Sequence, residues 1–510
     1  MKKRILAILA ALAMVFTLAS CSKGEANTSS TGTASTPVSG STAPKGEVQK
    51  LVMTFITWTG APTDLAVTQE KINEILRPKF NAEVEMQVYD FGSYKQNLTL
   101  ALAGGEQIDI MNGATLGYPN LVAQGYLLDL EEDGLFEKYG KGIVEAIGTE
   151  FIDACRIGGT LYGVPQNRDM AVGRGCHAVA SQYLEGIGYK TPADSGEIIK
   201  ITEAELNDIL AKIHNKYPDI ETYRPTTTNS FTQYSDIDML GGNVFGVLLD
   251  YGKELKVENL FTSDAYMNYC KLLFDWNKKG YISQDAATDT TAVATLVKAG
   301  TLATYTTAGK PGSKVQESGL GVDMTIFQTK EDFVASSAVA AFPWSIPINT
   351  ANKELAMQVL NEFYVNPELS TLLIYGIEGT HYELLDDGSA KSIADASGNV
   401  AYATLGWLAP NQFIAPVLAG NAPDLWEQTI DFNKNAKMSS ANGFTFDSSK
   451  VATEMAAVQN VYDEYQKSVE FGFLDPEKAI PEMNEKMLSA GLQKIIDEKQ
   501  AQLDAWKAMK

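Results

Sequence analysis

Side chains that commonly carry out catalysis are sparse in this sequence. Its three histidines, His177, His214 and His381, lie far apart along the chain. The sequence contains no G-x-S-x-G nucleophile elbow, no H-E-x-x-H zinc motif and no Walker-type phosphate loop. Its 63 acidic residues make chance pairs of carboxylates plentiful, so the sequence does not exclude a pair of carboxylates that cleaves glycosidic bonds. The absence of these motifs argues against the common hydrolase classes and leaves a surface-anchored polysaccharide-degrading enzyme as an alternative.

One segment has the first residues of a calcium-binding loop but lacks the later ones. Asp129-x-Glu131-x-Asp133-Gly134 resembles the start of a calcium loop, but Glu131 stands where Asp or Asn is favoured. Gly140 occupies the position at which such a loop needs a bidentate glutamate. We therefore expect no metal ion, and no motif indicates a cofactor.

The cysteines do not indicate a disulfide framework. Beyond Cys21 there are Cys155, Cys176 and Cys270, which are odd in number and widely separated. Cys176 precedes His177, but no second pair of ligands follows at zinc spacing. Buried, structural thiols are the better interpretation.

The N-terminus has the pattern of a secretory signal. Positive residues 2–4 precede an uncharged apolar run, Ile5 to Leu18, which is shorter than the roughly 20 residues that span a bilayer. Leu18-Ala19-Ser20-Cys21 resembles the bacterial lipobox, in which the cysteine is lipidated. We predict a signal peptide over 1–20 and lipidation at Cys21; an ordinary signal with a chance cysteine is the alternative.

Residues 22–46 are rich in Ser, Thr, Gly, Ala and Pro and predict a flexible linker. A coil of that length reaches on the order of 25–30 Å. Together, lipid and linker predict a protein held at the outer face of the cell membrane.

The body of the chain, 47–510, is long enough for two or three domains. Its 45% hydrophobic and 20% charged residues are ordinary for a globular protein. The net charge of −22 repels phosphate backbones, so nucleic acid is excluded as an expected partner. We expect a monomer.

Strand-like and helix-like segments alternate along this body, which predicts an α/β fold with mainly parallel sheets. The predicted strands are 51–56, 84–88, 108–111 and 301–306, with a proline-broken extended segment at 339–348. The predicted helices are 68–76, 94–103, one after the capping box Thr202-x-x-Glu205, 266–276, 291–298, 352–364 and a last helical region over 480–496.

Several segments, taken in their order and spacing, resemble the extracellular solute-binding proteins of ABC importers, of the large type that includes maltose-binding protein. They are 98–111 (LTLALAGGEQIDIM), 159–165 (GTLYGVP) and 345–364 (SIPINTANKELAMQVLNEFY). The last third resembles a Firmicutes-type lipoprotein subgroup with its own C-terminal domain, through 375–382 (YGIEGTHY), 443–447 (GFTFD), 471–478 (FGFLDPEK) and 491–506.

This resemblance implies a two-lobed, type II periplasmic-binding-protein-like fold with the ligand cleft between the lobes. It implies a first lobe of 47–165 plus about 338–382, a second of 166–337 plus about 383–440, and a C-terminal helical region, 441–510. The implied function is capture of a solute, with a carbohydrate or oligosaccharide favoured, and its delivery to ABC permease subunits. A peptide or another polar solute in the same role is the alternative, and an adhesin would be a third class.

In such a cleft, aromatic rings pack on sugar faces and polar side chains bind the hydroxyls. Trp58 ends the first strand, and Tyr305-Thr306-Thr307 departs from the tryptophan-bearing loop of many relatives, so the stacking residue stays open. Trp276 and Trp506 lie on amphipathic helices and indicate packing. The resemblance implies these ligand-binding candidates: Trp58, Gln166, Asn167, Arg168, Asp169, Tyr305, Trp344, Glu378, His381 and Trp407. For Arg168 and Asp169 an interdomain ion pair is equally open, and for His381 a structural hydrogen bond is favoured.

Overall fold

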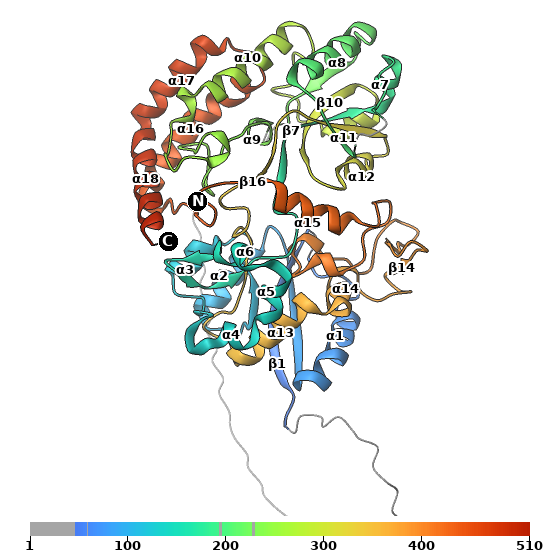
Figure 1. Cartoon of the computed structure of the whole chain (residues 1–510), viewed down its shortest axis with the longest axis vertical. Helices are drawn as coiled ribbons and strands as arrows, with labels where there is room; N and C mark the ends of the chain where they lie inside the picture. The colour runs from blue at the N-terminus through green and yellow to red at the C-terminus, as the bar shows by residue number, and fades with distance from the viewer. Residues whose placement is uncertain (1–45, 59, 193–195, 227–229, 510) are drawn as a thin grey trace, which may run out of the picture. The chain divides into compact units, whose positions relative to one another are not determined.

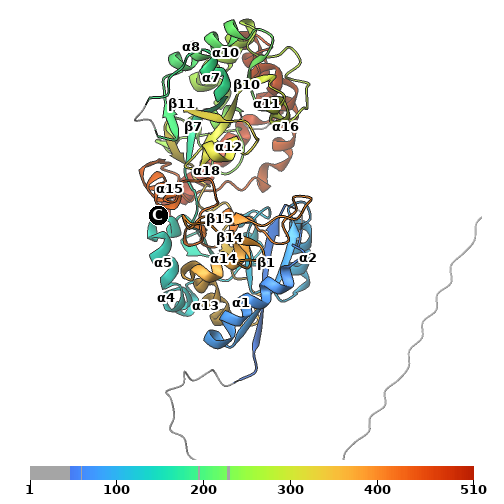
Figure 2. The same cartoon turned by 90° about the vertical axis from the view of Figure 1, so that its right-hand side faces the viewer.

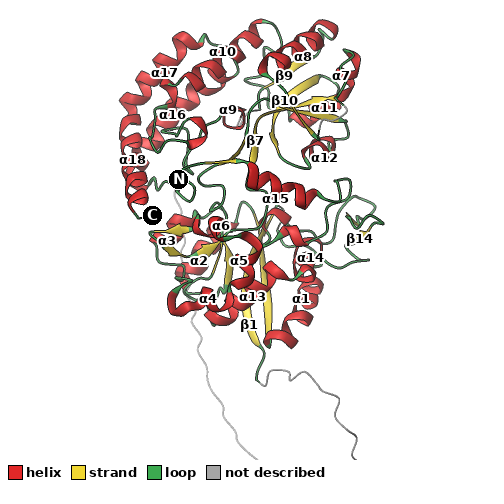
Figure 3. Cartoon of the chain, in the orientation of Figure 1, coloured by secondary structure: helices red, strands yellow, loops and turns green. Residues whose placement is uncertain are grey.

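Two separate β-sheets organise the chain in the computed structural model, which describes residues 46–58, 60–192, 196–226 and 230–509 (Figures 1 and 3). The signal peptide, Cys21 and almost all of the predicted linker lie outside these residues. Within them, no helix is both long enough and apolar enough to cross a bilayer.

The first sheet has the strand order β2-β1-β3-β13-β6. These strands are β2 (Ala82–Asp90), β1 (Gln49–Thr57), β3 (Ile110–Asn112), β13 (Trp344–Ser345) and β6 (Gly163–Val164). β1 pairs in parallel with β2 and β3, whereas β13 runs antiparallel to β3 and β6. Since β1 is buried from Leu51 onward, its continuous apolar run is that of a central strand covered on both faces.

Helices cover this sheet and complete the first apolar core. They include α1 (Leu65–Phe80), α2 (Tyr94–Gly104), α3 (Tyr118–Ala123), α4 (Leu135–Tyr139), α5 (Lys141–Ile147), α6 (Thr149–Asp153), α13 (Lys353–Val365) and α14 (Pro367–Tyr375). The strands and helices predicted up to residue 111 and over 352–364 are confirmed, with ends that differ by a few residues.

The second sheet has the order β16-β12-β7-β10-β9, and β11 pairs with β7 and β8. Its strands are β7 (Val172–Ala180), β8 (Ile198–Lys200), β9 (Glu221–Arg224), β10 (Leu302–Gly309), β11 (Met324–Gln328), β12 (Asp332–Val334) and β16 (Lys437–Met438). β7 runs antiparallel to β10, β11 and β12, so this sheet is mixed rather than mainly parallel.

The second sheet is flanked by α7 (Ser181–Gly186), α8 (Glu203–Lys216), α9 (Ser230–Tyr234), α10 (Asp264–Lys278), α11 (Val293–Lys298) and α12 (Ser313–Ser318). The predicted capping box is present, because Thr202 accepts from the Glu205 amide and the Glu205 carboxylate accepts from the Thr202 amide.

The C-terminal helices are α16 (Ala452–Glu470), α17 (Pro476–Ala490) and α18 (Leu492–Ala508) (Figure 1). α16 and α17 pack against α10, α18 packs against α16 and α17, and all three contribute to an apolar core of the second lobe. The last helical region expected over 480–496 is two helices. Gly491 separates them at a φ of 112°, a left-handed conformation that glycine adopts without steric strain.

The chain crosses between the sheets three times: between β6 and β7, between β12 and β13, and through α15 (Leu425–Asn435) into β16. The antiparallel hairpin of β14 (Tyr382–Leu384) and β15 (Ala390–Ser392) lies beside α14 (Figure 2). Leu405, Leu408 and Ala415 belong to the first core rather than the second. We therefore propose that the first lobe continues to about residue 415, beyond the boundary near 382 expected from the sequence, because burial of these side chains fixes the segment there.

Candidate functional site

Two aromatic rings meet where neighbouring parallel strands end. Trp58 follows β1 and Phe91 follows β2, and their rings stack with centroids 5.0 Å apart and planes inclined by 23°. Trp58 is 63% exposed, which is unusual for so large an apolar side chain. The Thr57 hydroxyl donates to the Gly60 carbonyl at 2.6 Å and fixes the turn after β1. The pair therefore presents an accessible, oriented aromatic face at the carboxyl edge of the first sheet.

A second aromatic group lies on the return crossing. The Phe342 ring contacts Trp407 edge to face, with centroids 5.5 Å apart, and the Arg168 guanidinium lies 5.9 Å from its centroid. The Phe342 carbonyl accepts hydrogen bonds from the side-chain amides of Asn112, at 2.9 Å, and Gln166. Residues from β3, from the first crossing and from the segment around Trp407 thus converge on one residue of the return crossing.

Charged side chains join the first crossing to the second lobe. Lys310, which follows β10, forms an ion pair with the Asp169 carboxylate at 2.6 Å. Arg168 lies 3.8 Å from the same carboxylate and donates to the Ala338 carbonyl at 3.2 Å. Burial lowers the pKa of Arg168, opposed by the nearby Asp169 charge. The ion pair that joins the first crossing to the second lobe is Lys310–Asp169 rather than Arg168–Asp169, and ligand contact by Arg168 and Asp169 stays a prediction.

The side-chain nitrogens of Gln166 and Asn167 both donate to backbone carbonyls of other segments, whereas the buried Gln166 Oε1 has no hydrogen-bond partner. Gln166 is fully buried. The Asn167 amide group donates to the Ala146 carbonyl at 3.1 Å, and its main chain pairs with that of Asn411. These two members of the predicted ligand set hold the crossing against the first lobe.

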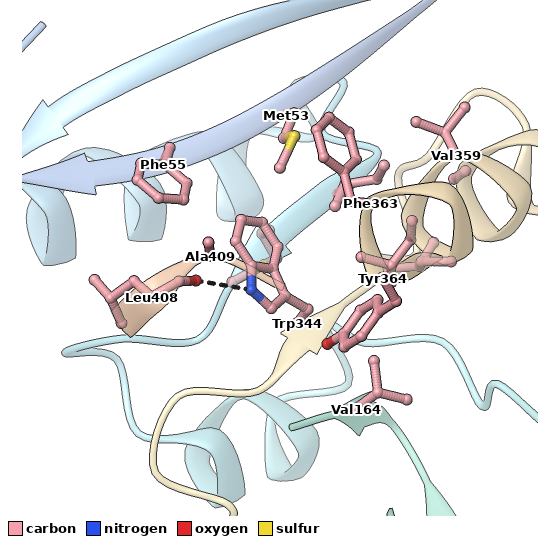
Figure 4. Packing of buried hydrophobic residues seen from close by; sticks show 14 of the residues in the cluster. Met53, Phe55, Val164, Trp344, Val359, Phe363, Tyr364, Leu408 and Ala409 are labelled. Carbon is pink, nitrogen blue, oxygen red and sulfur yellow. Dashed lines mark hydrogen bonds between the residues drawn. The ribbon is translucent and has the colours of Figure 1, made fainter. Parts of the chain in front are cut away.

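Trp344 corrects a prediction from the sequence, because it is a core side chain and not a ligand platform. It is fully buried, stacks on Phe55 with centroids 5.8 Å apart, and donates from its indole nitrogen to the Leu408 carbonyl at 3.0 Å (Figure 4). Since β13 lies between β3 and β6 within the sheet, its tryptophan is covered by the first core.

Tyr305 and His381 are also buried and engaged within the protein. The Tyr305 hydroxyl donates to Glu317 at 2.5 Å, and burial raises its pKa, as does this carboxylate. The His381 ring accepts from the Ile377 amide at 2.9 Å and lies 3.2 Å from Asp64, which bears out the structural interpretation of this histidine. Long-range packing therefore covers both rings, and Tyr305 does not present the accessible face that a stacking residue needs.

Glu378 lies in a hollow whose lining includes neither Trp58 nor Phe91. It is exposed and lines a cavity of about 820 Å³ between α1 and α14. The residues brought together near the crossings are therefore Arg168, Asp169 and Trp407. Phe91, Lys310 and Phe342 were missed, although Phe91 could have been found from its place at the end of the strand next to β1.

Acidic side chains of the calcium-like loop form ion pairs with basic side chains of the protein. Glu131 pairs with Arg156 at 2.6 Å, Asp133 pairs with Lys353 at 2.9 Å, and Asp129 accepts from the Glu131 amide. In the described part of the chain, no cluster of three or more His, Cys, Asp or Glu side chains is arranged to hold a metal ion.

The thiols and the adjacent histidine are buried. Cys155, Cys176 and Cys270 are free and buried, as predicted, and burial raises the pKa of each. Burial lowers the pKa of His177 to about 3, so this ring is neutral at pH 7. Nothing in these environments activates a nucleophile.

Comparisons with known proteins agree with this architecture. The family described as "Domain of unknown function (DUF3502)" matches residues 440–508. The carbohydrate ABC transporter substrate-binding protein of Streptococcus pneumoniae serotype 4 is 27% identical over 457 residues, covering 87% of this chain and 88% of that protein.

Two solved structures show the fold. The N-glycan transport solute binding protein NgtS from Streptococcus pneumoniae has a TM-score of 0.76 at 24% identity, covering 90% of this chain and 98% of its own. An extracellular solute-binding protein from Bifidobacterium longum subsp. infantis has a TM-score of 0.61 at 16% identity, covering 91% and 99%. The expected resemblance and the expected fold are confirmed.

Proposed function

We propose that this chain, a solute-binding protein by its fold and its relatives, is the subunit of an ABC importer that captures an extracellular carbohydrate and delivers it to the membrane permease. Its relative in Streptococcus pneumoniae is named for carbohydrate transport, and NgtS has been solved in complex with Man1GlcNAc and with Man5GlcNAc. These relatives support a sugar over a peptide or another polar solute.

The observation that carries the proposal is the Trp58–Phe91 pair. Sugars offer apolar C–H faces, and an exposed tryptophan held flat by a second ring presents a surface for them. Polar groups that could fix the orientation of such a ligand lie on the crossings, where Arg168 lies over the Phe342 ring and Asp169 lies beside Arg168. Binding pockets generally combine a mostly apolar lining with a few convergent polar groups in this way.

Delivery follows from closure of the two lobes over the ligand. A ligand that contacts both lobes favours the closed arrangement by its differential affinity for that state. Hinge closure of this kind is the general behaviour of periplasmic binding proteins. The closed, loaded protein then differs in surface from the empty one, which allows a permease to distinguish the two.

The same proposal includes an extracytoplasmic, lipid-anchored and monomeric protein. Cys21 is the proposed lipidation site, and residues 22–46 are the proposed linker that lets the lobes reach a membrane permease. We assign no catalytic residue and no cofactor, because the binding role requires neither and its relatives are transport proteins.

The test is binding of Man1GlcNAc and Man5GlcNAc, measured by thermal shift and then by calorimetry. A ligand at 100 times its Kd stabilises the protein by about 2.7 kcal/mol, which raises the Tm measurably. Covering about 100 Å² of the Trp58 face contributes about 2.5 kcal/mol, so Trp58→Ala should weaken Kd about 70-fold. Leu100→Ala is the matched control, because Leu100 is a similarly exposed apolar residue of the first lobe, 64% accessible.

An unchanged Kd in Trp58→Ala would remove the aromatic pair from the site. Turnover of any of these glycans, detected by chromatography after incubation, would favour the enzyme alternative and contradict the binding role.

A further inference from the structure

Asn433, near the end of α15, is bonded to the first crossing by all of its polar side-chain atoms. Its Oδ1 accepts from the backbone amides of Met170, at 2.8 Å, and Ala171, at 3.0 Å. Its Nδ2 donates to the Arg168 carbonyl at 2.7 Å. These three bonds attach three consecutive peptide groups of the crossing to α15. Asn433 is only 7% exposed, so the bonds are largely shielded from water.

The stretch that Asn433 binds, Arg168 to Ala171, lies between a segment attached to the first lobe and a strand of the second lobe. On its N-terminal side, the Asn167 amide donates to the Pro410 carbonyl at 2.8 Å, and Asn167 accepts from the Gln412 amide at 3.2 Å. On its C-terminal side, Val172 begins β7 of the second sheet. Arg168 to Ala171 is therefore the part of the first crossing between these two attachments, and within it Met170 and Ala171 are buried in the first apolar core.

The helix that holds this stretch is itself a crossing. At its start, the Trp426 indole donates to the Ala415 carbonyl at 2.8 Å, and Ala415 belongs to the first core. At its end, the chain enters β16 of the second sheet. α15 thus connects the same two lobes as the stretch that Asn433 binds.

We propose that Asn433 is a positioning residue for ligand capture. It joins Arg168–Ala171 and the end of α15 into one block against the first core, so that the second lobe turns about the backbone on the C-terminal side of this block. Because the block carries Arg168 and Asp169, Asn433 also fixes how these two side chains face Phe342 and Lys310. The role in capture rests on the function proposed above, whereas the rigidity of the block is a property of the free protein.

An amide is the side chain that this position requires. One oxygen must accept hydrogen bonds from two backbone amides, and one nitrogen must donate to a carbonyl. The short side chain of Asn carries both groups. Met170 and Ala171 are 4% and 0% exposed, so water does not replace the lost acceptor. Asn433→Asp keeps the acceptor and loses the donor, whereas Asn433→Leu loses both.

The first experiment is hydrogen exchange of the free protein. In the wild type we expect protected amides at Met170 and Ala171. We expect their exchange to be at least tenfold faster in Asn433→Leu, and near the wild-type rate in Asn433→Asp. Asn435→Leu is the matched control, because Asn435 is exposed on the same helix. Unchanged protection of both amides in Asn433→Leu would overturn the block.

The second experiment measures Man5GlcNAc binding by calorimetry and ligand-driven compaction by small-angle scattering. A merely structural residue would lower Tm and leave Kd and the compaction of the folded protein unchanged, and that result would overturn the positioning role. We expect Kd to weaken about tenfold in Asn433→Leu, with reduced compaction at saturation, and to stay within twofold in Asn435→Leu. If Asn433→Leu does not fold, Asn433→Asp is expected to show the same effects to a smaller extent, and wild-type behaviour would refute the role. Absence of glycan binding by the wild type would refute the proposed function, and the exchange experiment would still decide the block.

Discussion

Glu470 offers a test of how the C-terminal helices are joined to the second lobe. It is 3% exposed at the contact of α16 with α10, and it accepts hydrogen bonds from the hydroxyls of Tyr462, at 2.6 Å, and Tyr266, at 3.2 Å. Burial raises its pKa from 4.5 to about 7, although the bonds from Tyr462, Gln466 and Tyr266 oppose this. The protonated form is therefore the one that the fold favours.

The change we consider is Glu470→Gln, which keeps an acceptor for both hydroxyls and removes the charge. Because the folded protein holds the proton to about pH 7 and the unfolded chain releases it near pH 4.5, wild-type stability falls as pH rises between these values. At about 1.36 kcal/mol per pH unit, this interval corresponds to about 3 kcal/mol. Glu470→Gln should match the wild type near pH 4.5 and exceed its stability by up to about 3 kcal/mol at pH 8.

The assay is urea unfolding followed by circular dichroism at several values between pH 4.5 and 8. Glu464→Gln serves as the control, since its carboxylate is 67% exposed on the same helix, and it should show no such pH-dependent gain. If the difference between Glu470→Gln and wild type is the same at pH 5 and pH 8, the reasoning about burial of this carboxylate is refuted.

Three further changes test other parts of the structure. Trp344→Ala should destabilise the protein by about 3–5 kcal/mol, measured as a lower Tm, because it empties a buried site; an unchanged Tm would contradict its place in the core. Burial lowers the pKa of Lys499 from 10.5 to about 7, so the wild type should gain up to about 5 kcal/mol over Lys499→Met as pH rises from 7 to 10.5, and parallel pH profiles of unfolding would exclude this. Gly443→Ala should cost about 1–3 kcal/mol in urea unfolding, because φ is 90° and a Cβ would lie 2.7 Å from the Ala154 carbonyl oxygen; wild-type stability would show that this contact relaxes freely.

Local patterns in the sequence were sufficient for most elements of the fold. The apolar run of β1 and the capping box at Thr202 each depend on residues within a few positions, so their structures follow from local chemistry. The division of the last helical region into two helices was not predicted, because apolar spacing continues across Gly491 and the periodicity does not reveal the break. Phe91 could have joined Trp58 in the prediction, since both follow strands that pair in parallel.

By itself, the sequence determined the alternation of strands and helices, the absence of catalytic motifs and the kind of side chain available to a sugar. Only the tertiary structure decided which of these side chains are accessible. The Trp344 indole donates a hydrogen bond to a residue 64 positions later in the sequence. Asn433 accepts a hydrogen bond from Met170, which lies 263 positions earlier. Burial and hydrogen bonding of this kind are properties of segments that meet only after folding, so no local pattern specifies them. Trp58, by contrast, is 63% exposed although the Phe91 ring stacks on it, and that too is a result of tertiary packing.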